Sequence, residues 1–211
     1  MTRREYLRDP AEIRRLSRVL VLRETDVGGI PGDLVEVALR LVHAYGVPDI
    51  LADLAFSPGA GAAGRAALRE GATVLVDTEM VAHGIIPKLL PAANPVICKL
   101  NAPGVVEQAK SLGITRAAAA IELWRDALAG AVVAIGNAPT ALYRLLELLD
   151  EGASPPALVV AMPVGFVGAA EAKEALVEGG FDVPYVTLRG RRGGSALASA
   201  TVNALAAEMG Q

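Results

Sequence analysis

The sequence predicts an α/β fold, an open, mainly parallel sheet of about five strands flanked by helices, in a single domain covering residues 1–211. Short β-prone runs alternate with helical segments through the middle and C-terminal parts of the chain, which is the spacing of a parallel α/β sheet. A chain of 211 residues is long enough to bury one core, and no linker or repeat divides it. These observations together predict one α/β domain.

The strands are expected where short β-prone, apolar runs occur between turn signals. Five principal strands are predicted at 50–56, 73–77, 96–100, 131–135 and 158–162, and 184–188 is a sixth candidate. Because helical segments separate most of these runs, the strands should be joined by crossovers and lie parallel.

Helices fill most of the remaining chain. The segment 31–45 is a strong helix, because Pro31 suits a first turn and Gly46 can cap the end. One apolar stripe of this segment consists of Leu34, Ala38, Leu41, Val42 and Tyr45, and His43 lies beside it. Further helices are predicted at 115–128, 140–149, 171–178 and 195–208.

Composition argues against several classes of protein. The best candidate for a membrane span, 157–170, is short and is broken by Pro163, Gly165 and Gly168, so no membrane span is expected. The N-terminus lacks the apolar segment of a signal peptide and the lone Cys98 cannot form an internal disulfide, which indicates a cytoplasmic, reducing setting. The formal charge of −3 argues against a generally basic surface for nucleic acid.

Glycine-rich and polar loops follow four of the predicted strands, at 77–79, 136–140, 163–168 and 189–195. In a parallel sheet these loops lie at one edge, where ligands of open α/β folds usually bind. Glycine lets backbone amides approach a ligand, and the following helix starts favour anions. The last loop adds Arg189, Arg191 and Arg192. We therefore expect a multiply anionic ligand, with ordinary tight turns and solvated arginines as the alternative.

A second glycine cluster, Gly59-Ala60-Gly61-Ala62-Ala63-Gly64, matches the dinucleotide-binding fingerprint and precedes Asp77 at about the expected distance. Ser57 and Pro58 interrupt the passage from strand to loop, and alanine-rich sequence produces this pattern easily by chance. A nucleotide-dependent oxidoreductase is the alternative hypothesis, and it predicts cofactor binding that depends on Gly59 and Gly61.

Several longer motifs occur in order along nearly the whole chain. They are RLVH at 40–43, DTEMV at 77–81 with Gly84-Ile85, Thr115-Arg116, IGNAPTAL at 135–142, MPVGFVGA at 162–169, and RRGGS at 191–195 followed by VNAL at 202–205. With these motifs the sequence resembles the precorrin-8X methylmutase family, which includes the cobalt-precorrin-8 methylmutases, and 59–64 falls where that family has a helix start. Two departures are Ala172, where a serine is common, and Arg18, where an aromatic is usual.

The resemblance implies an isomerase of cobalamin biosynthesis. Its reaction is the 1,5-sigmatropic shift of a methyl group from C-11 to C-12 of precorrin-8X or cobalt-precorrin-8, giving hydrogenobyrinic acid or its cobalt counterpart, cobyrinic acid. It implies His43 as the acid catalyst, because a histidine can donate or accept a proton near neutral pH. Taken without the family, a lone histidine beside an apolar stripe is more often structural. His83 is expected to be peripheral.

The resemblance also implies how the substrate is held. Carboxylate arms would bind to Arg40, Arg116 and Arg191, and the ring face would be covered by Val164, Phe166 and Val167. Hydrogen bonds would come from Ser17, Thr78, Asn137, Thr140 and Ser195, for which capping roles are the alternative.

No cofactor or metal is expected, and a homodimer with the pocket at or near the subunit interface is implied by the same resemblance. Non-catalytic binding of a tetrapyrrole is the second functional hypothesis, and only turnover separates it from the first. The sequence does not decide whether the substrate carries cobalt.

Overall fold

Six strands form one sheet in the computed structural model, which describes residues 4–207. The strands are β1 (Leu54–Phe56), β2 (Val74–Val76), β3 (Val96–Cys98), β4 (Val132–Ile135), β5 (Leu158–Ala161) and β6 (Tyr185–Leu188). Their order is β1-β6-β5-β4-β2-β3, and every neighbouring pair is parallel except the antiparallel pair β1 and β6. The mainly parallel sheet is confirmed, and the sixth candidate strand is part of it.

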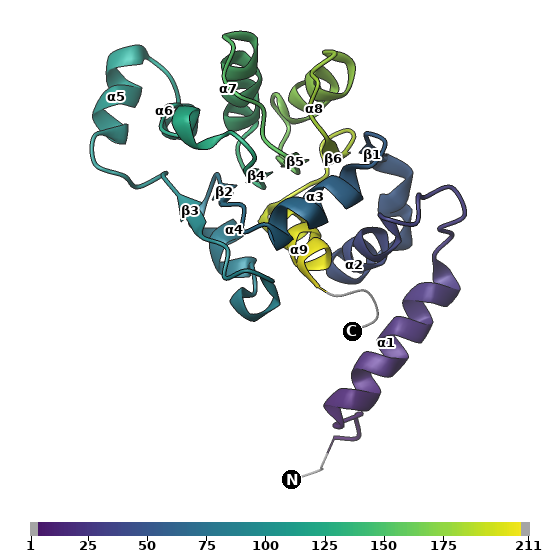
Figure 1. Ribbon diagram of the computed structural model, residues 1–211. Coiled ribbons are helices and arrows are strands. Elements are labelled where there is room, and N and C mark those ends of the chain that lie inside the picture. The colour runs from purple at the N-terminus through teal and green to yellow at the C-terminus, as the bar shows by residue number, and fades with distance from the viewer. Residues whose placement is uncertain (1–3, 208–211) are drawn as a thin grey trace.

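Helices cover both faces of the sheet (Figure 1). One layer contains α2 (Val35–Tyr45), α3 (Ala60–Arg69), α4 (Glu79–Gly84) and α9 (Ser195–Ala206). The other contains α5 (Val105–Leu112), α6 (Arg116–Glu122), α7 (Pro139–Asp150) and α8 (Ala169–Glu178). Alternate residues of one strand pack into different layers: Val132 and Ala134 of β4 join the core with α2 and α9, whereas Val133 joins the core with α7. Burial on both faces explains why these strands are apolar without interruption.

Several predicted element boundaries are wrong. The strand predicted at 50–56 is a 3-10 helix, η1 (Pro48–Asp53), followed by only three residues of β1, because Pro48 favours a helical first turn. The helix predicted at 31–45 begins only at Val35, after a turn closed by the Leu34 N–H donating to Pro31 O at 2.8 Å.

The helix predicted at 115–128 breaks into α6 and the 3-10 helix η3 (Arg125–Ala127), with the buried Trp124 between them. A further 3-10 helix, η2 (Pro87–Leu89), follows α4. The helices predicted at 140–149 and 171–178 start one and two residues earlier, as α7 and α8. The final helix, predicted to Glu208, ends at Ala206, and Glu208 lies outside the described residues.

The glycine cluster of the rival dinucleotide reading opens α3, but its glycines serve protein packing. A Cβ on Gly61 would lie 2.2 Å from the Asp33 carbonyl oxygen, and one on Gly64 would lie 2.6 Å from a Leu158 methyl. The Ala62 N–H, near the start of α3, donates to the Asp33 carboxylate at 2.9 Å. The protein's own carboxylate therefore occupies the position that a pyrophosphate would need, and this geometry argues against the nucleotide-dependent alternative.

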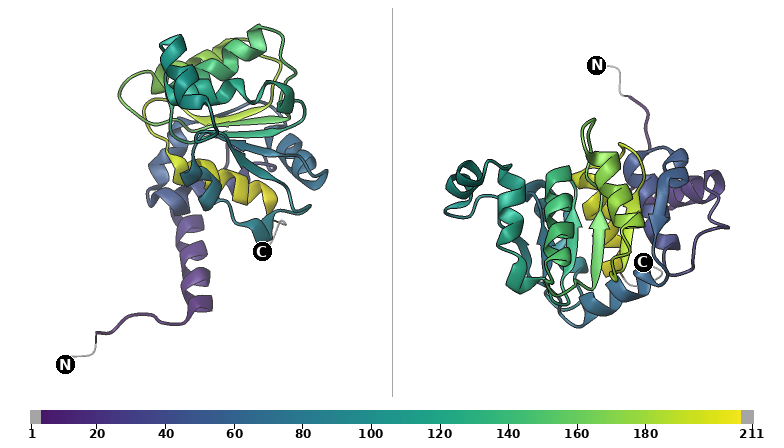
Figure 2. Two further views of the ribbon diagram at one scale, coloured as in Figure 1. Left: turned by 90° about the vertical axis from the view of Figure 1, so that its left-hand side faces the viewer. Right: turned by 90° about the horizontal axis from the view of Figure 1, so that it is seen from above.

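Helix α1 (Pro10–Glu24) projects from the body of the molecule (Figures 1 and 2). Asp9 caps it by accepting hydrogen bonds from the Ala11 and Glu12 N–H groups, and no residue of α1 is buried. Its contacts with the body run mainly along α2, where Arg18 forms an ion pair with Glu36. Within residues 4–207 no helix combines the length and apolar character needed to span a membrane.

Candidate active site

The loops after β2, β4, β5 and β6 converge at the carboxyl edge of the sheet, as expected for parallel strands. Hydrogen bonds join them to one another: the Val164 N–H donates to Asn137 O at 3.3 Å, and the Gly165 N–H donates to Arg191 O at 3.4 Å. The Thr78 and Ser195 hydroxyls share a bond of 3.4 Å. In the left panel of Figure 2 the start of α9, in yellow, lies on the same side of the molecule as α1, in purple.

Asp77 holds the loop between β4 and α7. Its side chain is 2% exposed and accepts three backbone N–H groups, those of Gly136, Asn137 and Ala138, each at 2.9 Å. Burial raises the pKa of this carboxyl, and the backbone hydrogen bonds oppose the rise. Asp77 was placed in the β2 loop by the sequence but was not predicted as a site residue, although an aspartate directly after a buried strand was a visible signal.

Two predicted substrate ligands, Thr78 and Ser195, are buried and bonded to each other. Thr78 also caps α4 by accepting from the Val81 N–H at 3.4 Å. A Cβ on Gly136 would lie 2.7 Å from the Ser195 Cα, so a glycine is required where the β4 loop meets the start of α9. In this structure the two hydroxyls therefore connect neighbouring loops.

The loop after β6, residues 189–195, which we call the basic loop, contains three arginines that differ in their partners. Arg189 pairs with Glu174, and Arg192 pairs with Asp49 at 3.1 Å and with Asp53 at 3.5 Å. Arg191 has no ion pair among the described residues, and its guanidinium lies 5.2 Å from the centre of the Phe166 ring. Of these three cations, Arg191 is the one left for an external carboxylate.

Arg116 is at the first position of α6, next to the start of α7. Thr115 caps α6 by accepting from the Ala118 N–H, and its hydroxyl lies 2.7 Å from that of Thr140 in the first turn of α7. Arg116 is exposed and forms no ion pair within the described part of the chain. The structure thus brings Arg116 and Thr140 together beside two helix starts, whose N–H groups favour anions.

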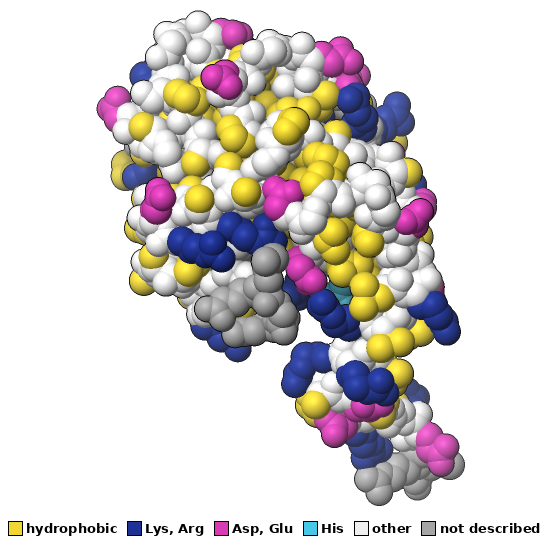
Figure 3. Space-filling model, turned by 45° about the vertical axis from the view of Figure 1, so that its right-hand side comes forward, with side chains coloured by type: hydrophobic (Ala, Val, Ile, Leu, Met, Phe, Trp, Pro, Cys, Tyr) yellow, Lys and Arg dark blue, Asp and Glu magenta, His cyan; other side chains and the backbone are white. Residues whose placement is uncertain are grey.

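His43 lies in a pocket of about 360 Å³ between α1 and α2, which we call the His43 pocket. The Ser17 hydroxyl lies 3.2 Å from His43 Nδ1. The other lining residues are Arg14, Arg15, Arg18, Val21, Leu22, Glu36, Leu39 and Arg40. Figure 3 shows basic side chains gathered where α1 leaves the body. The pocket is therefore lined by four arginines, one glutamate and three apolar side chains, and Ser17, Arg40 and His43 are brought together in it.

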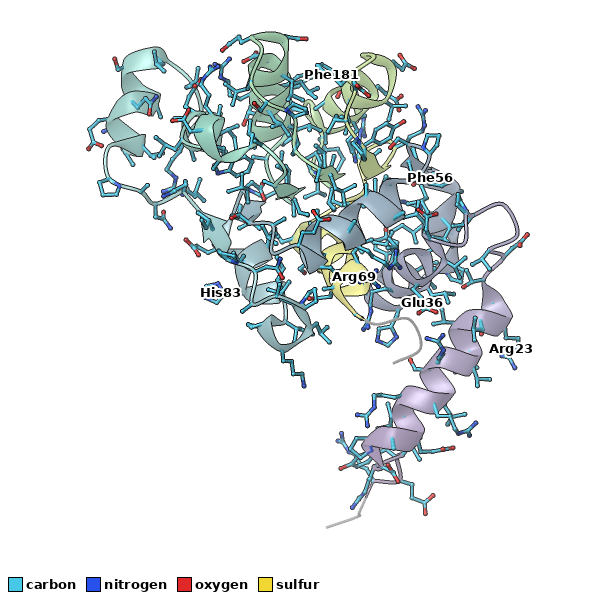
Figure 4. All side chains as sticks on the ribbon, in the orientation of Figure 1. Arg23, Glu36, Phe56, Arg69, His83 and Phe181 are labelled. Atoms are coloured by element: carbon cyan, nitrogen blue, oxygen red, sulfur yellow. The ribbon has the colours of Figure 1, made fainter. Side chains whose placement is uncertain are left out.

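The end of α2, the helix that carries His43, lies close to the basic loop. The Arg192 guanidinium lies 5.8 Å from the centre of the ring of Tyr45, which is two residues after His43. His83 is elsewhere: its Nδ1 lies 2.7 Å from the Glu79 carbonyl of its own helix, and Figure 4 shows His83 and Glu36 on opposite sides of α9. Within residues 4–207 no group of three or more His, Cys, Asp or Glu could hold a metal ion.

Comparisons with known proteins give one consistent result. A family model described as precorrin-8X methylmutase matches residues 12–208. A precorrin-8X methylmutase of Pseudomonas aeruginosa is 57% identical over 204 residues, covering 97% of this chain and 98% of that protein. A cobalt-precorrin-8 methylmutase of Methanothermobacter thermautotrophicus is 39% identical, with coverages of 93% and 92%. A solved precorrin-8x methyl mutase structure from Thermus thermophilus superimposes with a TM-score of 0.85 at 41% identity, covering 93% of this chain and 94% of that one.

Proposed function

The chain belongs to the precorrin-8X methylmutase family, and from this premise we propose that His43 is the acid that assists methyl migration. The chain is an isomerase that moves a methyl group on a corrin precursor in cobalamin biosynthesis. The expected step is the shift from C-11 to C-12 of the macrocycle. Because the methyl group moves within one molecule, the oxidation state is unchanged and the chemistry needs no redox cofactor.

The contact between Ser17 and His43 is the observation that carries the catalytic assignment. When the Ser17 hydroxyl donates to Nδ1 of a neutral ring, the proton of the imidazole is on Nε2; when the ring is cationic, Nε2 carries a proton as well. In both states Nε2 can donate to a macrocycle whose double bonds rearrange as the methyl group moves. A positioned acid of this kind typically contributes about a hundred- to ten-thousandfold in rate.

The carboxylate arms of the substrate are proposed to bind three arginines without ion pairs among the described residues, Arg40, Arg116 and Arg191. Guanidinium groups bind carboxylates in bidentate geometry. An arginine without an internal ion pair can bind a carboxylate without first breaking such a pair. Ser17, Thr78, Asn137, Thr140 and Ser195 are proposed to donate hydrogen bonds or to shape the loops that do.

An apolar cover for the ring is proposed in the loop after β5. Phe166 and Val167 are 84% and 88% exposed, and Val164 is 41% exposed. Large apolar side chains on a loop at the ligand edge are expected to lie against an apolar ligand surface. The cation of Arg191 beside the Phe166 ring would place charge at the rim of this cover, where a carboxylate arm leaves the macrocycle.

A homodimer is part of the proposal, because α1 presents exposed apolar side chains. Ile13, Leu16 and Leu20 are exposed at spacings of three and four residues, which places them on one face of the helix. A second copy related by a twofold axis could cover this face and close the open side of the His43 pocket. We also infer one domain over residues 1–211 and a cytoplasmic enzyme that acts on neither nucleic acid nor membrane.

Incubation with precorrin-8X, and separately with cobalt-precorrin-8, tests the proposal when the visible spectrum is followed. Rearrangement of the chromophore is expected with at least one of them, and the comparison identifies the form of the substrate. We expect precorrin-8X, because the Pseudomonas relative, the more similar of the two quoted above, carries that name. Tight binding with no spectral change in either case would instead support the non-catalytic tetrapyrrole-binding hypothesis.

A further inference from the structure

Lys173 is a buried cation that the proposed mechanism does not use. It lies on α8 and its side chain is 0% exposed. Its ammonium donates to the backbone carbonyl of Arg192 at 2.7 Å, and no ion pair of Lys173 occurs within residues 4–207. Burying a charge costs free energy unless the charge is well partnered. A buried lysine whose ammonium has one carbonyl as its partner is therefore expected to have a specific role.

The carbonyl that Lys173 holds is in the middle of the basic loop. The two ends of this loop are fixed by backbone bonds: the Arg189 N–H donates to Asp53 O at 2.7 Å, and the Gly194 N–H donates to Met162 O at 2.8 Å. Between these ends, Arg192 immediately follows Arg191, whose own carbonyl accepts from the Gly165 N–H at 3.4 Å. The contact from Lys173 therefore acts one residue away from the arginine of this loop that has no ion pair.

We infer that Lys173 is a positioning residue for substrate binding, because its ammonium fixes the Arg192 carbonyl and so aims Arg191 at a carboxylate arm. This inference rests on the proposed role of Arg191. Lys173 acts through the loop and does not touch the substrate. Loss of its proton weakens the hold, because a hydrogen bond from an ammonium is roughly twice as strong as one from a neutral donor.

Burial lowers the pKa of Lys173 to about 8, and the carboxylates of Asp53 and Glu174 oppose this fall. The loop packed against Lys173 contributes Arg189, paired with Glu174, and Arg192, paired with Asp49 and Asp53. Carboxylates and guanidiniums keep their charge between pH 7 and 9. Tyr45, beside Arg192, is a further titratable group at this loop. The hold on the loop should therefore weaken as the pH rises through about 8.

Spectral titration with hydrogenobyrinic acid, the expected product, tests this inference between pH 7 and 9. Wild-type affinity should fall by about fivefold over this range, and Lys173→Met should be about fivefold weaker at pH 7 with no further fall. Arg191→Ala should be about tenfold weaker, the loss of one exposed charge-assisted contact. Lys173→Met added to Arg191→Ala should weaken binding no further. In turnover, the loss caused by Lys173→Met should appear in KM rather than in kcat.

Lys110→Met, which removes an exposed lysine of α5, and Tyr45→Phe should both keep the wild-type pH dependence. The inference is overturned if Arg191→Ala weakens binding but Lys173→Met does not, or if the effects of the two changes add in full. An unchanged affinity in Arg191→Ala would instead remove Arg191 from the proposed site, and the inference with it. If Lys173→Met does not fold, the other proteins decide: a wild-type affinity that is constant from pH 7 to 9 is the contradicting result.

Discussion

At the scale of single residues, the proposed chemistry depends on a histidine and a serine from two helices that differ in how deeply they are buried. His43 is near the end of α2, whose apolar face is buried, whereas Ser17 is on α1, which buries none of its residues. In the proposed mechanism the Ser17 hydroxyl, 3.2 Å from His43 Nδ1, orients the imidazole, and Nε2 acts on the substrate. The proposed catalytic geometry therefore depends on α1 keeping its place beside α2.

Ser17→Ala should slow the rearrangement without abolishing it. The variant loses one hydrogen bond to the imidazole, which is worth about 1 kcal/mol and corresponds to roughly a fivefold loss of rate. Single-turnover measurement with precorrin-8X tests this, with Ser111→Ala on the exposed surface of α5 as the control. A Ser17→Ala rate equal to that of the control would remove Ser17 from the mechanism.

Arg116→Ala should weaken binding of the product by about 2 kcal/mol, or roughly thirtyfold, as expected for a charge-assisted hydrogen bond. The difference between the two proteins should shrink as salt is added, because the contact is exposed and therefore screened. Arg125→Ala is a matched control, since Arg125 lies on the neighbouring η3 and pairs with Glu151 at 2.5 Å. Equal affinities of the Arg116 and Arg125 variants would contradict this role for Arg116.

At the scale of elements, the sequence predicts the strands that are buried between the two helix layers. It does not predict the element boundaries that depend on local hydrogen bonds. Strands at 73–77, 131–135 and 158–162 were predictable because burial on both faces makes them continuously apolar. Helix α1 was not predicted, because it buries no residue and charged residues separate the apolar side chains of its sequence. The start of α2 and the break after α6 depend on turns whose hydrogen bonds leave little trace in the sequence.

In the candidate site, too, the sequence predicts the arrangement of the loops but not the contacts that hold them. The convergence of the loops follows from the parallel order of the strands and was predicted. The fastening of those loops by Asp77 and Lys173 was not predicted, because each residue acts on backbone groups of a segment distant in the sequence. Likewise, no pattern of arginines could show that Arg189 and Arg192 have internal carboxylate partners while Arg191 has none.

The packing of α3 gives a prediction about the glycine cluster. Gly61→Ala should lower the free energy of unfolding by about 1–3 kcal/mol or more, because the added Cβ would meet the backbone of Asp33 at 2.2 Å. Gly32→Ala is the control, since a Cβ at that position meets nothing within 4 Å. Urea unfolding of both variants tests the difference, and equal stabilities would contradict the close contact.

At the scale of the whole molecule, α1 projects from a body in which two layers of helices enclose one sheet. Helix α1 exposes apolar side chains and also forms one wall of the His43 pocket. The same helix therefore bears on both the proposed dimer and the proposed catalysis. If a second copy packs on α1, subunit contact also stabilises the wall that positions Ser17. The proposed dimer is therefore expected to be needed for full activity.

Light scattering at micromolar concentration should give about twice the chain mass of 21.7 kDa. Leu16→Asp with Leu20→Asp should shift the mass toward the monomer and lower turnover, because charges on the exposed apolar face of α1 oppose burial. Leu112→Asp, at an exposed apolar residue of α5, is the control and should leave the dimer intact. A monomeric mass for the wild type would contradict the proposed assembly.

The most direct test of the account is to measure binding and turnover separately in His43→Ala. The variant should bind the tetrapyrrole with an affinity within about tenfold of the wild type, since at most one contact is lost, and it should rearrange it about a hundred- to ten-thousandfold more slowly. His43→Asn should behave in the same way, because an amide cannot supply a proton at neutral pH, while His83→Ala should stay near the wild type. A His43→Ala protein that converts precorrin-8X at the wild-type rate in a single turnover would contradict the assignment of His43 as the acid.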